Sequence, residues 1–143
     1  MPADFAGEVT YANGSVPPPY HYEWRVAFDT RTARLEWTPG YDGTEETWTD
    51  TVDLDDEARR RLYDRIENTG LFEFRNSDDD MVGGPTGRAR FGSPRHDTGT
   101  LGTSEAGQDM LDELVAATKA TFPDRVWAEM ERKQSEWEEQ HPQ

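Results

Sequence analysis

The chain contains no cysteine, so neither a disulfide framework nor a thiolate metal site is available to it. Lysine is scarce, since Lys119 and Lys133 are the only two, and isoleucine occurs once, at Ile66. No segment approaches the roughly 20 apolar residues of a membrane-spanning helix. The first residues lack the basic region and apolar run of a signal peptide. We therefore expect a soluble, cytoplasmic protein.

Acidic residues outnumber basic ones by thirty to fifteen, which gives the 143-residue chain a formal net charge of -15. Binding to nucleic acid or to an anionic membrane needs a basic patch, so the composition argues against both partners.

Two interpretations of the acidity stay open. One is adaptation to a salt-rich cytoplasm, where charges are screened within roughly 3 Å at 1 M salt. The other is a surface for a basic partner, including mimicry of nucleic acid. The first is favoured, because a charge excess is usually a solvated face.

Alternation of apolar and polar side chains predicts most of the strands. Residues 20–29 alternate strictly, with the aromatics on one face, and this period of two is typical of a half-buried strand. Residues 33–38 repeat the alternation after a polar turn, so the two segments predict an antiparallel hairpin. An edge strand is expected at residues 5–11, further strands at residues 48–54 and 71–75, and a second hairpin at residues 88–101.

The clearest predicted helix begins after Asp55 and ends at Gly70. Asp55 is a favourable N-cap, and apolar residues follow it at helical spacing. Gly70 stands where a left-handed C-cap is expected, with Leu71 placed to contact Ile66. Two more helices are predicted. The first can be capped by Thr103 or Ser104 and is closed by Pro123, and the second runs from there to about residue 140.

This order of elements predicts an α+β fold. It consists of an antiparallel sheet of two hairpins plus extra strands, with helices on one face and a C-terminal helical extension. We expect one α+β domain over residues 1–122 and the helical extension over residues 123–143.

The acidic run around Asp78 and Asp80 is the best candidate for a metal site. Set on the EF-hand template from Asn76, it supplies oxygen ligands at the first positions. The position that requires glycine holds Met81, however, and the closing glutamate position holds Gly87. A solvated loop is therefore favoured, with weak calcium binding by Asp78 and Asp80 as the alternative.

Two histidines have a carboxylate close by in the sequence. His21 shares one face of a predicted strand with Glu23, and His96 precedes Asp97 in the second hairpin. Such a pair could provide a general base. Yet His21 falls opposite the aromatics, where surface residues belong, and neither a zinc-protease helix nor a serine elbow accompanies the histidines. Surface or capping roles are favoured over catalysis, and no cofactor is expected.

The last helix carries few apolar residues. Trp127, Met130 and Trp137 can line one narrow stripe on it. They either pack back on the domain or contact a partner, since tryptophan is enriched in interface hot spots. Packing on the domain is favoured for Trp127. For Trp137, packing and contact with a partner are equally favoured. The three residues are the candidate binding residues, either for another protein or for self-association.

Several stretches have a familiar layout. Residues 20–24, 54–72 and 82–84 resemble small uncharacterised prokaryotic α+β proteins, and the composition resembles that of haloarchaeal proteins. The order of a helix, Leu71-Phe72 and a hairpin is similar to that of emfourin-type inhibitors of metalloproteases. This resemblance implies an inhibitor-like, non-enzymatic role. The leading hypothesis is accordingly a protein-binding or inhibitor-like module, and the alternatives are a hydrolase-like enzyme with a His/carboxylate site and an acidic mimic of nucleic acid.

Overall fold

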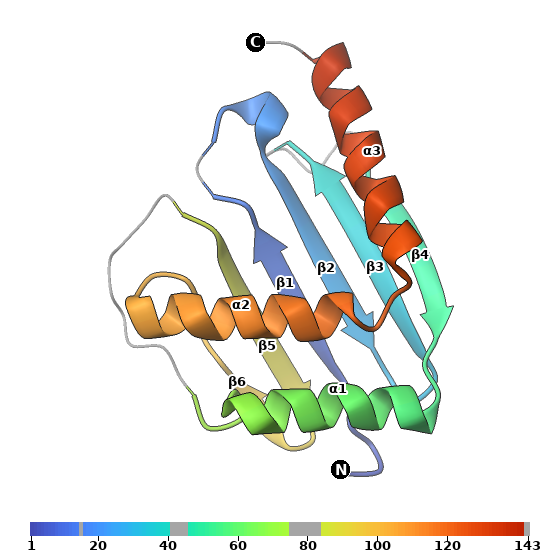
Figure 1. Cartoon of the computed structure of the whole chain (residues 1–143), viewed down its shortest axis with the longest axis vertical. Coiled ribbons are helices and arrows are strands. Elements are labelled where there is room, and N and C mark those ends of the chain that lie inside the picture. Colours follow the sequence, from blue (N-terminus) through green and yellow to red (C-terminus); the bar gives the residue numbers. More distant parts are fainter. Residues whose placement is uncertain (15, 41–45, 75–83, 142–143) are drawn as a thin grey trace.

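A computed structural model describes residues 1–14, 16–40, 46–74 and 84–141. It contains an antiparallel sheet with three α-helices in front of one face (Figure 1). The predicted α+β class, with helices on one face and a helix at the C-terminus, is confirmed. No helix within the described residues is both long and apolar enough to cross a membrane.

The sheet has six strands in the order β4-β3-β2-β1-β5-β6. The strands are β1 (Gly7–Ala12), β2 (Tyr22–Phe28), β3 (Thr32–Pro39), β4 (Trp48–Asp53), β5 (Thr86–Gly92) and β6 (Arg95–Asp97). The two predicted hairpins are β2–β3 and β5–β6, and each pairs antiparallel. The expectation that the N-terminal strand lies at an edge of the sheet is wrong. It lies between the hairpins and joins them, because β1 pairs with both β2 and β5.

The alternation seen in the sequence determines which face of the sheet is buried. Trp24 lies opposite Trp37 across the β2–β3 ladder, and Val26 lies opposite Leu35. All four side chains point toward the helices and are buried. Their polar neighbours along each strand point to the other face, which we call the open face because the three helices leave it uncovered.

The helices are α1 (Asp56–Thr69), α2 (Glu105–Lys119) and α3 (Asp124–Gln140), and a short 3-10 helix, η1 (Pro18–Tyr20), precedes β2. Asp55 caps α1 as predicted, since its carboxylate accepts a hydrogen bond of 2.8 Å from the amide of Ala58. Ser104 caps α2 in the same way, at 3.0 Å from the amide of Gly107. The capping signals therefore located both N-termini.

The strand predicted at residues 71–75 is wrong for the residues described there. Gly70 ends α1 in the left-handed conformation, with φ of 82°, and the Leu71 amide returns to the Ile66 carbonyl as a Schellman ending requires. The chain then turns, because Glu73 donates to the Gly70 carbonyl. The side chain of Leu71 is buried in the core from this turn, so its apolar character reflects burial rather than strand pairing.

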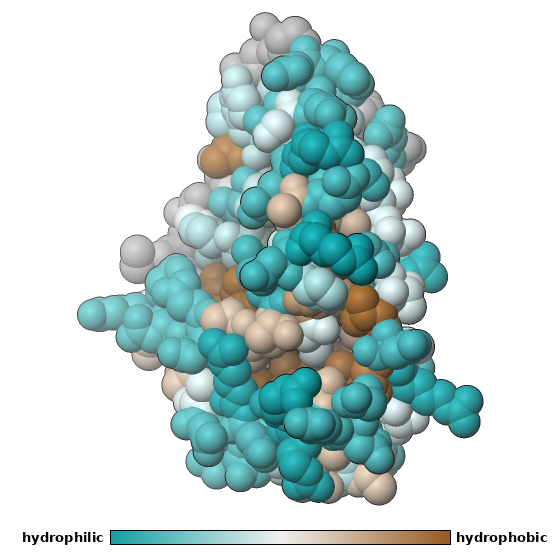
Figure 2. Space-filling view, turned by 45° about the vertical axis from the view of Figure 1, so that its right-hand side comes forward, coloured by the Kyte–Doolittle hydropathy of each residue, from teal (hydrophilic) through white to brown (hydrophobic). Residues whose placement is uncertain are grey.

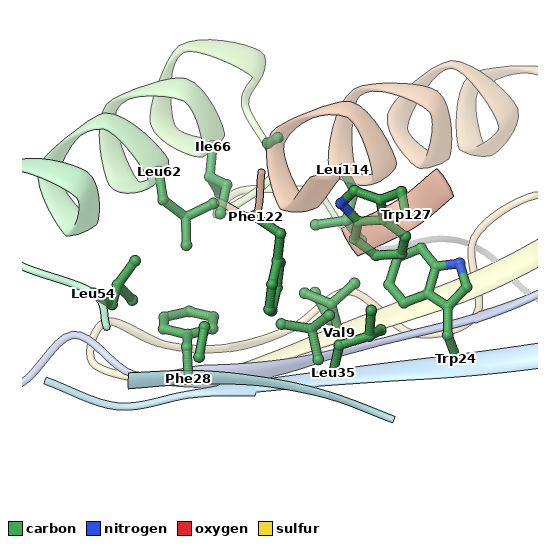
Figure 3. Packing of buried hydrophobic residues seen from close by; sticks show 14 of the residues in the cluster. Val9, Trp24, Phe28, Leu35, Leu54, Leu62, Ile66, Leu114, Phe122 and Trp127 are labelled. Carbon is green, nitrogen blue, oxygen red and sulfur yellow. The ribbon is translucent and has the colours of Figure 1, made fainter. Parts of the chain in front are cut away.

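The core lies between the sheet and the helices. Figure 3 shows Val9, Phe28 and Leu35 rising from the strands toward Leu62, Ile66 and Leu114 on the helices. Trp127 of α3 meets Trp24 of β2 edge to face, with ring centroids 5.2 Å apart. The predicted boundary after Phe122 falls in the turn between α2 and α3, but both sides of that turn contribute to one core.

Candidate functional site

His21 has a structural role at the start of β2. Its ring is 3% exposed, and Nδ1 lies 2.9 Å from the Gly14 carbonyl oxygen. Nε2 lies 3.4 Å from the Glu23 carboxylate. The expectation that His21 lies at the surface, on the polar face of the strand, is therefore wrong. The Gly14 carbonyl and the Glu23 carboxylate lie against the ring, and it is buried although the alternation places it outside.

His96 and Asp97 lie at the other edge of the sheet and point to opposite faces. His96 Nε2 lies 2.7 Å from the Phe74 carbonyl oxygen, so the ring holds the segment that follows α1. Asp97 accepts two hydrogen bonds from the Arg88 guanidinium, one of them 2.8 Å long from Nε. The bonds from Arg88, helped by the Gly99 amide, hold the pKa of Asp97 well below its usual range. A carboxylate held in this way is a weak base at neutral pH.

The two histidine–carboxylate pairs do not form one site. In the sheet, β1 and β5 separate β2 from β6, which puts the pairs about 14 Å apart across the strands. The register places His96 level with Phe28, at the far end of β2 from His21, so the pairs are also about 20 Å apart along the strands. No group of three or more histidine, aspartate or glutamate side chains among the described residues could hold a metal ion. The metal candidates Asp78 and Asp80 lie outside the described residues.

The three candidate binding residues of α3 are all buried. Trp127 donates a hydrogen bond of 3.0 Å from its indole to the Lys119 carbonyl, and Met130 is 2% exposed. Trp137 is 7% exposed and stacks on His141, with ring centroids 4.1 Å apart. Packing on the chain itself accounts for all three residues without a partner. Contact of these residues with a partner stays a prediction.

Glycine at position 40 permits the approach of Trp137. Gly40 has φ of 73°, and a β-carbon there would lie 3.0 Å from the far edge of the indole. Gly40 therefore presents only its backbone to the ring. This contact joins the end of α3 to the end of β3, and the sequence could not reveal it because the two residues are almost a hundred positions apart.

A groove runs between α1 and α2. The two helices are antiparallel, so the first turns of α1 face the last turns of α2 (Figure 1). Two adjoining hollows, of about 640 and 230 Å³, lie along the helix pair and share Arg61 and Arg65 as lining residues. We call the two hollows together the α1–α2 groove.

The floor of the α1–α2 groove is apolar. Leu62 of α1, Ala117 of α2 and Ala120, the C-cap residue of α2, line its narrower end, and Met110 lines the wider end. Figure 2 shows apolar surface gathered around α2 and in the gap toward α1, with hydrophilic surface above and below. Apolar surface bounded by charged side chains is typical of an interaction site.

The two walls of the groove carry opposite charge. Arg61 and Arg65 project from α1 on either side of Asp64, so that wall is net positive, and Asp109 and Glu113 make the α2 wall negative at the wider end. In the part of the chain that the structure describes, no ion pair crosses the groove. Arg61 pairs only with Glu57 of its own helix, at 3.0 Å, and Arg65, Asp109 and Glu113 form no ion pair there. These charges are therefore available to a ligand.

The open face of the sheet also has a hollow, of about 420 Å³, with Arg25 and Arg88 on either side of Thr10. Here the charges are already satisfied within the chain. Arg25 lies 2.6 Å from Glu8, and Arg88 is held by Asp97. The α1–α2 groove is therefore the stronger candidate for a functional site, and the sequence did not reveal it, because its residues come together only when the two helices pack.

Comparison with known proteins adds no relative: no protein-family model matches the chain, and no curated protein is significantly similar to it. The resemblance to emfourin-type inhibitors and to small prokaryotic α+β proteins stays a prediction.

Proposed function

We propose that this protein is a non-enzymatic module that binds another protein, as an inhibitor does, through its helical layer. The observation that carries the proposal is the α1–α2 groove, in which an apolar floor lies between walls of unbridged opposite charge. An apolar centre with a charged rim is the usual composition of a protein interface. The hydrolase-like alternative has less support, since His21 and His96 lie on separate strands and each ring contacts a backbone carbonyl.

The distribution of charge supports a protein partner that is not itself acidic. Helix α2 carries four carboxylates against Lys119 alone, and α3 carries six against three basic residues. These exposed carboxylates repel acidic proteins and attract basic ones, and the range of both effects becomes shorter as the salt concentration rises. Near the groove, Arg61 and Arg65 of α1 interrupt this acidic surface.

Site-specific photo-cross-linking in cells of the source organism tests the proposal. A photo-reactive side chain at Ala120, which is exposed beside the groove, should capture a defined protein. The same group at Ala128, which is exposed on α3 but does not line the groove, is the matched control. Equal capture at both positions, or none at Ala120, would contradict binding through this layer.

A further inference from the structure

We infer that the α1–α2 groove accepts an amphipathic α-helix of the partner, which presents an acidic row to α1 and a basic row to the first turns of α2. This inference rests on the proposed protein-binding function and specifies the partner for that site.

The shape of the groove favours a helix. It extends along α1 from Ala58 to Thr69, which is about 17 Å at 1.5 Å per residue, or three helical turns. The small side chains of Ala117 and Ala120 allow a third helix to approach closely, within the 8–10 Å axis separation of packed helices.

Backbone hydrogen bonding also argues against an extended segment in this place. An extended peptide usually binds by adding a strand to a free sheet edge, where main-chain groups are unpaired. The walls here are two helices whose interior N–H and C=O groups bond within each helix. An extended segment would therefore bury its own backbone without partners, at a cost of about 1–3 kcal/mol for each group. A helix satisfies its backbone internally and avoids this cost.

The walls determine the charge pattern of the bound helix. Arg65 is exposed, has no ion pair among the described residues and lines both hollows, so a carboxylate on the near flank of the partner helix can reach it. Asp109 and Glu113 occupy the opposite wall at the wider end, where a lysine or arginine on the far flank can reach them. Leu62 and Met110 contact the apolar ridge between these two rows. The expected partner thus has apolar residues at i, i+3 or i+4 and i+7.

Selection from a displayed library of random peptides, each about 16 residues or four helical turns long, tests this inference on the whole purified chain. Enriched peptides should share the apolar spacing, with acidic residues on one flank and basic residues on the other, and should become helical on binding. Enrichment of peptides without this pattern, or no enrichment, overturns the inference.

A pair of matched variants then locates the binding site. Arg65→Glu should weaken binding of an enriched peptide by about three- to tenfold, because attraction becomes repulsion at one rim position. Arg60→Glu makes the same charge change on the same helix but does not line the groove, and it should leave affinity unchanged. A peptide whose facing glutamate is changed to lysine should recover its affinity for Arg65→Glu. Equal weakening by the two variants overturns the inference.

The opposite wall provides a second test. Asp109→Lys should weaken the same peptide, and a basic residue of the peptide changed to glutamate should restore it. Folding of each variant is checked by circular dichroism. If these peptide experiments fail but a protein is cross-linked at Ala120, protein binding is supported and only the helical partner is excluded. If the peptide experiments and the cross-linking at Ala120 both fail, the proposed function is excluded as well.

Discussion

Arg59 shows how one residue can join distant parts of the chain. Its guanidinium is 3% exposed and donates from Nη2 to the backbone carbonyls of Ala3 and Phe5, at 3.1 and 2.9 Å. It also bonds Asp56, one turn earlier in α1, at 3.3 Å. Asp55 and Arg59 are four residues apart, a spacing that allows an ion pair on a helix surface. Instead, Asp55 caps the helix, and Arg59 turns inward to hold the N-terminal segment against α1.

Gly70→Ala should destabilise the protein by about 1 kcal/mol, because a β-carbon is penalised in the left-handed region. An added β-carbon would meet no atom within 4 Å at this position, so the cost is one of backbone conformation alone. Urea unfolding measures it. Gly84→Ala is the control, since this glycine has equal space and no left-handed φ. Equal stability of the two variants would show that the C-cap is assigned wrongly.

Tyr22 should make stability fall at high pH. Burial, followed by the charges of nearby Tyr11, Glu131 and Glu138, raises the pKa of its phenol from 10.0 to about 12. Between these values the unfolded chain loses the proton while the folded chain keeps it. The stabilisation is therefore fully present below pH 10 and is lost as the pH rises to about 12.

Denaturant unfolding from about pH 9 to 12 should therefore show a smaller decline for Tyr22→Phe than for the unaltered protein. Tyr20→Phe removes an exposed phenol and should retain the full decline. A curve for Tyr22→Phe that matches the unaltered protein would show that the phenol ionises equally in both states.

At the scale of elements, α3 depends on a few long-range contacts. The Trp37 indole donates to the Gln134 side chain at 3.1 Å, and the amide of Gln134 reaches the Pro19 carbonyl at 3.3 Å. Gln134 thus bonds β3 and η1 to the middle of α3, and Trp137 continues the contact toward the C-terminus. The sequence of so polar a helix contributes little stability by itself, so these tertiary contacts hold α3 in place.

Trp137→Ala should destabilise the protein by about 3–5 kcal/mol, the usual cost of removing a buried tryptophan side chain. Its mass in solution should stay the same, because the indole packs within its own chain. Urea unfolding and light scattering measure the two quantities, and Glu136→Ala, at an exposed neighbour, is the control. A fall in mass with little loss of stability would instead make Trp137 a self-association contact.

At the scale of the whole molecule, the acidic excess is unevenly distributed. The strands contain nearly equal numbers of acidic and basic residues, and on the open face arginines and carboxylates form ion pairs across neighbouring strands. The excess therefore lies on α2, α3 and the connecting segments. On α3, Glu129 and Glu136 pair with Arg132, and the other carboxylates of α2 and α3 form no ion pair among the described residues and repel one another.

Stability should therefore rise when dilute buffer is replaced by molar KCl, because the Debye length falls to roughly 3 Å and repulsion between unpaired carboxylates is screened. Thermal unfolding across a KCl series measures the effect, and sucrose at matched osmolality controls for solvent exclusion. A melting temperature that stays level or falls with KCl would favour a binding surface over salt adaptation as the reason for the acidity.

Local sequence determined most of the elements. Alternation specified the buried faces of β2 and β3, because neighbouring side chains of a strand point to opposite sides regardless of what covers them. The caps at Asp55, Ser104 and Gly70 were predictable because each forms hydrogen bonds within a few residues. The charge and the absence of cysteine follow from composition alone.

Only the tertiary structure determined which residues these helices and strands contact. The burial of His21, the irregular path after Gly70 and the contact between Trp137 and Gly40 all depend on segments far away in the chain. The α1–α2 groove depends on such packing too, since Arg65 and Asp109 line one hollow although more than forty residues separate them. Residue spacing specifies the face on which a side chain lies, whereas the partner of that face is chosen by the packing of the whole core, which no local pattern encodes.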